Sequence, residues 1–105
     1  MIDRLLITLR ALAASPDEQL EHFPDFVGKP DELALDFGDA YRLLQQCQQL
    51  ELSAAQRDAV AAVDRILDQM SGPEHGVLWT EAALRRAPEW EQVRGAARAA
   101  LRVLG

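Results

Sequence analysis

The chain has 105 residues, of which 49% are hydrophobic and 27% charged, and this balance is typical of one globular domain spanning residues 1–105. Its net charge of −6 argues against direct binding to nucleic acid, because such binding depends on cationic contacts to phosphate. No stretch approaches the roughly 20 apolar residues of a membrane-spanning helix, so no contact with a membrane is expected.

Cysteine usage and the N-terminal segment both favour a cytoplasmic location. The only cysteine, Cys47, has no partner for an internal disulfide, which fits a reducing compartment. The first 15 residues have an apolar centre, but Asp3 and Arg10 interrupt it, and the segment is more typical of a helix than of a signal peptide. Ten of the eleven basic residues are arginine, a composition associated with GC-rich bacterial genomes.

The first predicted elements are two helices separated by a capping signal. Apolar residues recur at helical spacing from Ile2 to Ala13 and form one face. Ser15 and Glu18 then form a capping box, which begins a second helix that Pro24 keeps short.

The third helix has two possible starting points. If it begins at Pro30, Asp36 falls among the apolar residues of the buried face, where an unpaired carboxylate is costly. If Asp36 is the N-cap, that conflict disappears and Asp39 lies near the positive end of the helix dipole. The second alternative is preferred, and it leaves residues 29–35 as a turn or a short separate helix.

The fourth helix has the clearest boundaries. Ser53 and Gln56 form a capping box, and Gly72 followed by Pro73 is a stop signal. Its predicted core face consists of Ala59, Ala62, Val63, Ile66 and Met70.

The remaining segments complete a helical fold. After a predicted loop over residues 72–79, Thr80 caps a short helix and Pro88 begins the last one. No segment shows the alternation expected of a strand. The predicted fold is therefore all-α, a compact bundle of about five helices, two of them short, with no β-sheet.

The residues needed for nucleophilic catalysis are missing. Ser15 and Ser53 already serve as caps, Ser71 adjoins a helix end, and Cys47 falls in phase with a buried face, where a thiol is normally inert. Lys29 lies between glycine and proline in a predicted loop. The sequence therefore predicts a protein without catalytic activity and without a cofactor.

One alternative is a metal-dependent or acid–base enzyme centred on His22. The carboxylates of Asp25, Asp36 and Asp39 follow this residue, and histidine with carboxylates can hold zinc or iron. Their spacing matches no ordered metal-binding motif, so no metal site is predicted. The alternative requires His22 to converge with at least two of these carboxylates in a concave pocket.

Arginines recur every four residues on the last helix, at Arg94, Arg98 and Arg102. They could form a binding stripe for an anionic partner. The favoured alternative is intramolecular: Glu91 pairs with Arg94, and the arginines receive the acidic segment of the same chain.

Acidic residues are concentrated in one part of the chain. Residues 17–39 contain eight Asp or Glu against one lysine, whereas residues 51–105 contain eight acids against seven arginines. Apolar side chains are interleaved with the first group. They either fasten a long loop to the core while the acids face water, or form with the acids a docking surface for a basic protein.

The leading hypothesis is a small acidic protein-binding module without catalytic activity. A concrete version is an immunity- or antitoxin-like inhibitor of a basic partner protein. Acids would steer the partner and aromatic rings would supply contact area; the residues are Phe23, Asp25, Phe26, Asp31, Glu32, Asp39 and Tyr41. A further alternative is a homo-oligomeric structural protein that assembles through the apolar run at residues 77–79.

Overall fold

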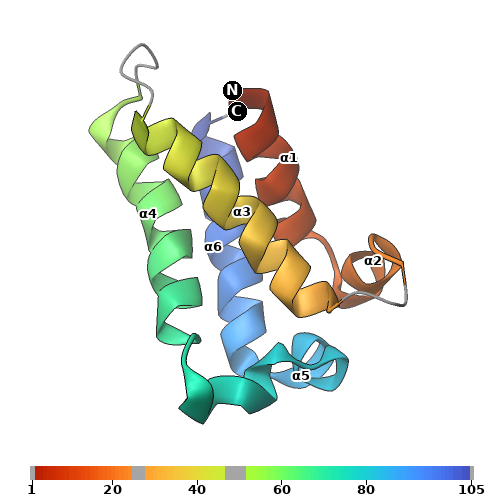
Figure 1. The fold of residues 1–105 in the computed structure, drawn as a ribbon. Helices are drawn as coiled ribbons and strands as arrows, with labels where there is room; N and C mark the ends of the chain where they lie inside the picture. Colours follow the sequence, from red (N-terminus) through yellow and green to blue (C-terminus); the bar gives the residue numbers. More distant parts are fainter. Residues whose placement is uncertain (1, 25–27, 47–51, 105) are drawn as a thin grey trace.

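The computed structural model describes residues 2–24, 28–46 and 52–104, and over these residues it is all-α with no strand. The predicted fold class is confirmed (Figure 1). Two elements, α2 and α5, are short, and five have seven residues or more, close to the predicted number. The elements are α1 (Ile2–Ala13), α2 (Pro16–Glu21), α3 (Lys29–Gln46), α4 (Ala54–Gln69), the 3-10 helix η1 (Pro73–Trp79), α5 (Glu81–Arg86) and α6 (Pro88–Leu104).

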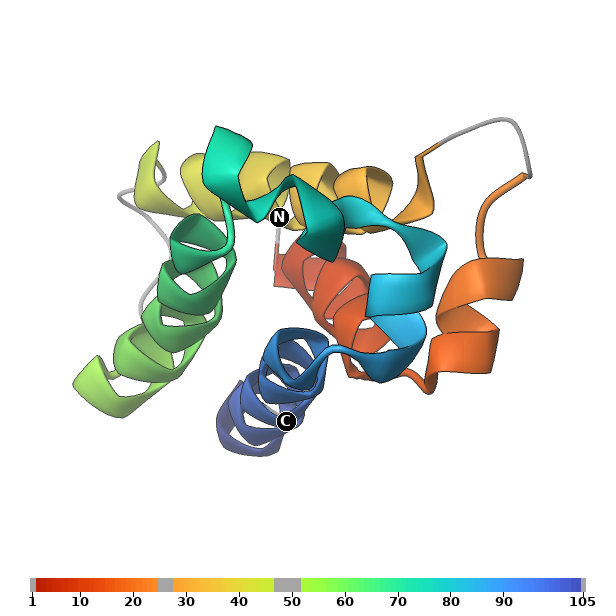
Figure 2. The same cartoon turned by 90° about the horizontal axis from the view of Figure 1, so that it is seen from below.

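Helix α6 is the centre of the assembly. It runs antiparallel to α1 and α4 and packs against both. Helix α3 crosses diagonally over α1 and α4, on the side of these helices that faces away from α6 (Figures 1 and 2). Helices α3 and α4 approach each other closely at only a few positions. The core is drawn from every one of these four helices and includes Leu5, Leu9, Leu12, Phe37, Val63, Trp90, Val93 and Ala97. None of the described helices is long and apolar enough to cross a lipid bilayer.

The predicted helix caps are confirmed. The side chain of Ser15 accepts from the backbone of Glu18 and that of Ser53 from the backbone of Gln56, and both capping boxes are complete. The Thr80 hydroxyl caps α5 by accepting from the backbone of Ala83 at 3.0 Å. These contacts satisfy amide groups that the first turn of a helix leaves without partners.

The predicted start of the third helix at Asp36 is wrong, because α3 begins at Lys29 and is continuous through residues 29–35. Asp36 nevertheless escapes burial and is exposed. Successive residues turn by about 100° around a helix axis, so Asp36 lies about 100° from buried Phe37, at the edge of the core face. The buried face is formed by Leu33, Phe37, Ala40 and Leu44.

Two further expectations need correction. Residues 73–79 form a 3-10 helix in place of a loop. In α4 the buried residues are Val60, Val63 and Leu67, followed by Met70, whereas Ala59, Ala62 and Ile66 are only partly buried. Two neighbouring apolar stripes on α4 share Val63 and Met70, and the packing of α6 against this helix buries the stripe that includes Val60 and Leu67.

Candidate protein-binding groove

An open groove of about 570 Å³ lies between α3 and α4. The first half of α3 forms one wall, the last turns of α4 form the other, and η1 contributes Trp79. Its lining residues are Asp31, Ala34, Leu35, Phe37, Gly38, Arg42, Asp64, Leu67, Asp68, Ser71, Gly72 and Trp79. The groove exists because α3 crosses the molecule diagonally and leaves its N-terminal half unpaired with α4 (Figure 1).

Apolar side chains form the floor of the groove. Phe37 and Leu67 belong to the core, and Trp79 is partly buried beside them. The indole Nε1 of Trp79 donates to the carbonyl of Met70 at 2.9 Å, and its ring meets Trp90 edge to face with the centroids 5.5 Å apart. The tryptophan is thus fixed in place, with part of its surface left on the groove.

Carboxylates dominate the charged lining. Asp31 comes from α3, and Asp64 and Asp68 lie one turn apart on α4. The one guanidinium in the lining, that of Arg42, is paired with Asp39. Among the residues that the structure describes, no cation forms an ion pair with Asp64 or Asp68.

The electrostatics of the groove affect Asp64 directly. Partial burial raises the pKa of its carboxyl, and the nearby charge of Asp68 raises it further. Carboxylates four residues apart on a helix repel each other, and Asp68 also lies in the last turn, at the negative end of the helix dipole. Both effects cost stability.

Tyr41 borders the same region from α3. Its ring stacks on Phe37 with the centroids 5.7 Å apart and the planes 12° apart. Burial raises the pKa of the phenol, and Asp64 across the gap raises it further. The hydroxyl therefore stays protonated at neutral pH and can donate a hydrogen bond.

Gly38 lies in the interior of α3 and lines the groove. A methyl group at this position would meet only the tip of Arg42, at 3.7 Å, which is an ordinary contact. Glycine inside a helix costs about 0.5–1 kcal/mol relative to alanine. The packing of the described residues does not explain why glycine, and not alanine, occupies this position.

The structure separates the predicted site residues. Asp31 lines the groove, Asp39 is exposed and paired with Arg42, and Glu32 is only partly buried. Tyr41 packs at the border of the groove, whereas Phe23 packs against the core at the end of α2. Asp25, Phe26 and Cys47 lie outside the described residues.

Several groove residues escaped the sequence analysis. Asp64 and Asp68 belong to a half of the chain whose acids and arginines nearly balance, and that average concealed a local acidic pair. Trp79 was considered only as part of the apolar run at residues 77–79. The available signal was the Asp64–Asp68 spacing itself, which places two acids on one helix face beside apolar Leu67. Leu35, which is 56% exposed at the groove, is one of the apolar residues that the sequence interleaves with the acids of residues 17–39.

His22 lies in a different part of the molecule. It is exposed at the end of α2 and lines a smaller hollow of about 300 Å³ together with Ile7, Arg10, Ala11, Ala14 and Glu18. The enzyme alternative requires at least two of Asp25, Asp36 and Asp39 beside His22, and neither Asp36 nor Asp39 lines this hollow. Within residues 2–24, 28–46 and 52–104, no group of three His, Cys, Asp or Glu could hold a metal ion.

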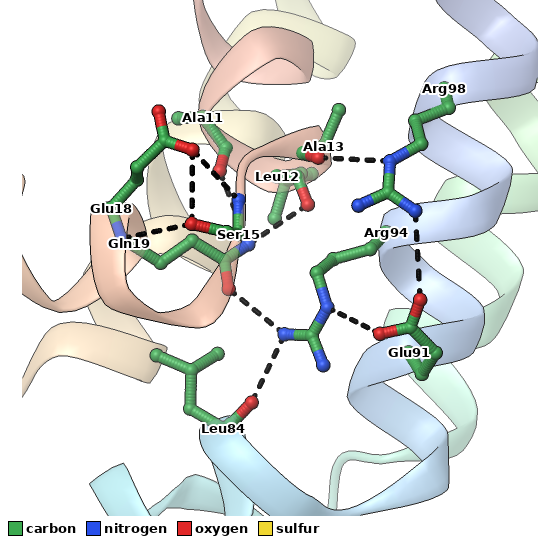
Figure 3. Close-up of polar contacts among 10 residues, drawn as sticks. All are labelled: Ala11, Leu12, Ala13, Ser15, Glu18, Gln19, Leu84, Glu91, Arg94 and Arg98. Atoms are coloured by element: carbon green, nitrogen blue, oxygen red, sulfur yellow. Dashed lines mark hydrogen bonds and ion pairs between the residues drawn. The ribbon is translucent and has the colours of Figure 1, made fainter.

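The arginines of α6 do not form a surface stripe, because Arg94 is buried (Figure 3). Its Nε donates to Glu91 at 2.8 Å, and its Nη1 donates to the side-chain oxygen of Gln19 at 2.9 Å and to the carbonyl of Leu84 at 3.0 Å. The expected Glu91–Arg94 pair is confirmed.

Other arginines also act within the fold. Arg98 donates to the carbonyl of Ala13 at 3.1 Å, so it joins α6 to the end of α1 (Figure 3). Arg85 pairs with Asp17 at 2.5 Å. One member of the acidic segment is therefore paired within the molecule, although its partner is an arginine of α5 and not one of the α6 arginines for which the pairing was expected.

Comparison with known proteins gives no relative for this chain. No protein-family model matches it, and neither a curated protein nor a solved structure shows significant similarity.

Proposed function

We propose that this protein is a small binding module without catalytic activity, and that it binds a basic protein through the α3–α4 groove. An immunity- or antitoxin-like inhibitor of a basic partner is the concrete form of this proposal. The observation that carries it is the combination, in one groove, of an apolar floor and two carboxylates that no described cation neutralises.

Several features of the groove lower the stability of the free protein. Asp64 and Asp68 repel each other, and Asp68 opposes the helix dipole. Leu35, which is 56% exposed, and the partly buried Trp79 leave apolar surface on the groove. A basic partner segment would reverse both costs, since its cations would neutralise the carboxylates and its apolar atoms would cover the floor. Interfaces commonly combine a central apolar contact with complementary charge in this way.

A test is site-specific photo-crosslinking in cells of the source organism. A benzophenone amino acid would replace Leu35, which is exposed at the groove, and in a matched control it would replace Val103, which is exposed at the end of α6. A basic protein captured from position 35 and not from position 103 would then be purified, and its affinity for the unmodified chain measured.

The proposal requires that affinity to fall when Asp64 and Asp68 are changed to Lys. A captured protein that binds the charge-reversed variant as tightly as the unmodified chain would contradict the groove as the binding site. Crosslinks from position 35 to a second copy of this chain would instead support the homo-oligomeric alternative.

A further inference from the structure

We propose that the protein associates weakly with a second copy of itself, and that the exposed face of α1 in one copy packs antiparallel on the exposed face of α3 in the other. This inference goes beyond the proposed function and does not depend on a basic partner. It also differs from assembly through residues 77–79, because that run takes no part in the contact.

Each of the two faces has a large apolar side chain exposed at its centre. Ile7 on α1 is 59% exposed and Leu35 on α3 is 56% exposed, and they are two of the four exposed large hydrophobic residues in the described part of the chain. Ile7 borders the hollow of about 300 Å³, whose lining includes the small residues Ala11 and Ala14, and Leu35 borders the α3–α4 groove. Each face therefore offers a projecting apolar side chain and a concavity beside it.

Two arginines flank Ile7 on α1. Arg4 and Arg10 lie three residues before and three residues after it, and because successive residues turn by about 100° they lie on opposite sides of Ile7. Both arginines are exposed, and neither forms an ion pair with a residue that the structure describes. Asp3 lies on the same face, and Glu18, across the hollow, is engaged in its capping box. The face thus presents two unpaired cations around an apolar centre.

Acids flank Leu35 on α3. Asp31 and Asp39 lie four residues before and four residues after it, again on opposite sides, and Glu32 lies next to Asp31. Within residues 2–24, 28–46 and 52–104, Asp31 and Glu32 form no ion pair, and Asp39 pairs with Arg42 on the same helix. A carboxylate has two acceptor oxygens, so Asp39 can accept from a second arginine as well.

The two sets of charges match when the helices pack antiparallel with their apolar centres in contact. Arg10 then faces Asp31, and Arg4 faces Asp39. The heights agree, since a rise of about 1.5 Å per residue places the arginines about 4.5 Å and the acids about 6 Å from the centre along the helix axis. Both arginines of α1 therefore gain a carboxylate partner in the same arrangement.

The acid of the α1 face selects the antiparallel direction. A parallel arrangement would also bring the arginines to acids, but it would place Asp3 opposite Glu32, and like charges in contact repel. In the antiparallel arrangement Asp3 lies on the side of Arg42, which has the opposite charge.

The contact is small and does not close on itself. Because it uses one helix face from each copy, it is well below the standard size of a stable interface, and we expect a dissociation constant of about 0.1–1 mM. A copy that is bound through α1 keeps its own α3 face free, so the contact builds rings or open chains. Asp31 and Leu35 also line the α3–α4 groove, so a second copy and a basic partner would exclude each other.

The experiment measures self-association by sedimentation equilibrium from about 20 μM to about 1 mM. Arg10→Glu and Asp31→Arg should each weaken association at least about fivefold, because each places like charges in contact. A mixture of the two variants should associate, since α1 of the Asp31→Arg chain meets an unaltered α3. Arg86→Glu and Asp58→Arg are the matched controls, because they make the same charge changes at exposed positions on α5 and α4 and should leave association unchanged.

The double variants test the direction of the contact. Arg10→Glu combined with Asp31→Arg leaves the net charge unchanged and should restore association to within about twofold, because the two charges have exchanged places. Arg4→Glu combined with Asp31→Arg should not restore it. Restoration by the second combination and not by the first would overturn the antiparallel arrangement. Circular dichroism would verify that each variant is folded.

The surface of the contact has its own readout. In NMR spectra recorded on dilution, the backbone amides of Ile7 and Leu35 should shift, and that of Val77 should not. Shifts confined to residues 77–79 would overturn the α1–α3 contact in favour of the apolar run. A protein that stays monomeric at about 1 mM would overturn self-association and leave the proposed binding of a basic protein unaffected.

Discussion

Arg94 places a full positive charge in the interior and gives it three hydrogen-bond acceptors. The side chain is 2% exposed, and its acceptors come from α2, α5 and its own helix. Gln19 extends the network by donating to the carbonyls of Ala11 and Leu12 at 3.2 and 2.9 Å. This arrangement fastens the two short helices, which bury little surface of their own, to α1 and α6.

Replacing this arginine by leucine should destabilise the fold. Arg94→Leu would leave the buried oxygens of Gln19 and Leu84 without a donor, at a cost of about 1–3 kcal/mol each. We expect a total loss of about 2–6 kcal/mol in the free energy of unfolding, measured by urea denaturation. Arg102→Leu, at an exposed position on the same helix, should cost less than about 1 kcal/mol. Similar losses in the two variants would contradict the structural role of Arg94.

Asp64 should give a pH-dependent effect on stability. Its pKa is raised above the ordinary 3.8, so its contribution to folding is fully favourable below that pH and is lost as pH rises through the folded-state pKa. Asp64→Asn should therefore stabilise the protein at pH 7 by up to about 1 kcal/mol, since the group is partly solvated. This gain should disappear as the pH falls toward about 3, as measured by urea denaturation across the range.

Glu91 provides the opposite control for that measurement. The hydrogen bond from Arg94, and then its charge, lower the pKa of this carboxyl below the ordinary 4.5. Its contribution is present above that value and is lost as pH falls through the folded-state pKa. Glu91→Gln should therefore lower stability at pH 7 and lose its effect in acid. If both variants followed the same pH trend, the assignment of these two environments would be wrong.

At the scale of the helices, the sequence predicted those helix starts that depend only on residues close together in the chain. The capping boxes at Ser15 and Ser53 depend on side chains three residues apart, so the sequence was enough to place both helix starts. The start of α3 was missed because Asp36 was assigned to the buried face from spacing alone. Only the packing of α3 on α1 shows where that face ends.

The position of Asp36 within α3 has a direct test. An N-cap aspartate contributes about 1 kcal/mol, so Asp36→Ala would be destabilising if the helix began there. Inside a helix and exposed, the same change should be neutral or stabilising by up to about 0.7 kcal/mol, because alanine has the higher helix propensity. The free energy of unfolding distinguishes the two cases. A loss near about 1 kcal/mol would indicate that the helix begins at Asp36 and not at Lys29.

At the scale of the whole molecule, the groove could not be predicted because it belongs to no single segment. Its walls come from residues 31–42 and 64–72, and they meet only through the diagonal crossing of α3 over the other helices (Figure 2). The sequence did indicate Asp31 and an acidic surface with apolar residues. It did not show that Asp64 and Asp68 would complete that surface from a part of the chain that is nearly neutral on average.

The position of Asp68 predicts that stability and partner binding oppose each other at this residue. Asp68→Asn removes a charge from the negative end of α4 and relieves repulsion with Asp64, so it should stabilise the free protein by about 0.3–1 kcal/mol. The same change should weaken binding of the basic partner by about 2- to 10-fold and reduce the salt dependence of its affinity. Asp58→Asn is the matched control, because it makes the same charge change at an exposed position of α4 outside the groove lining. Unfolding measurements and titrations at low and high salt would test both expectations. If Asp58→Asn and Asp68→Asn weaken binding equally, the partner responds to the overall charge of −6 and not to the groove.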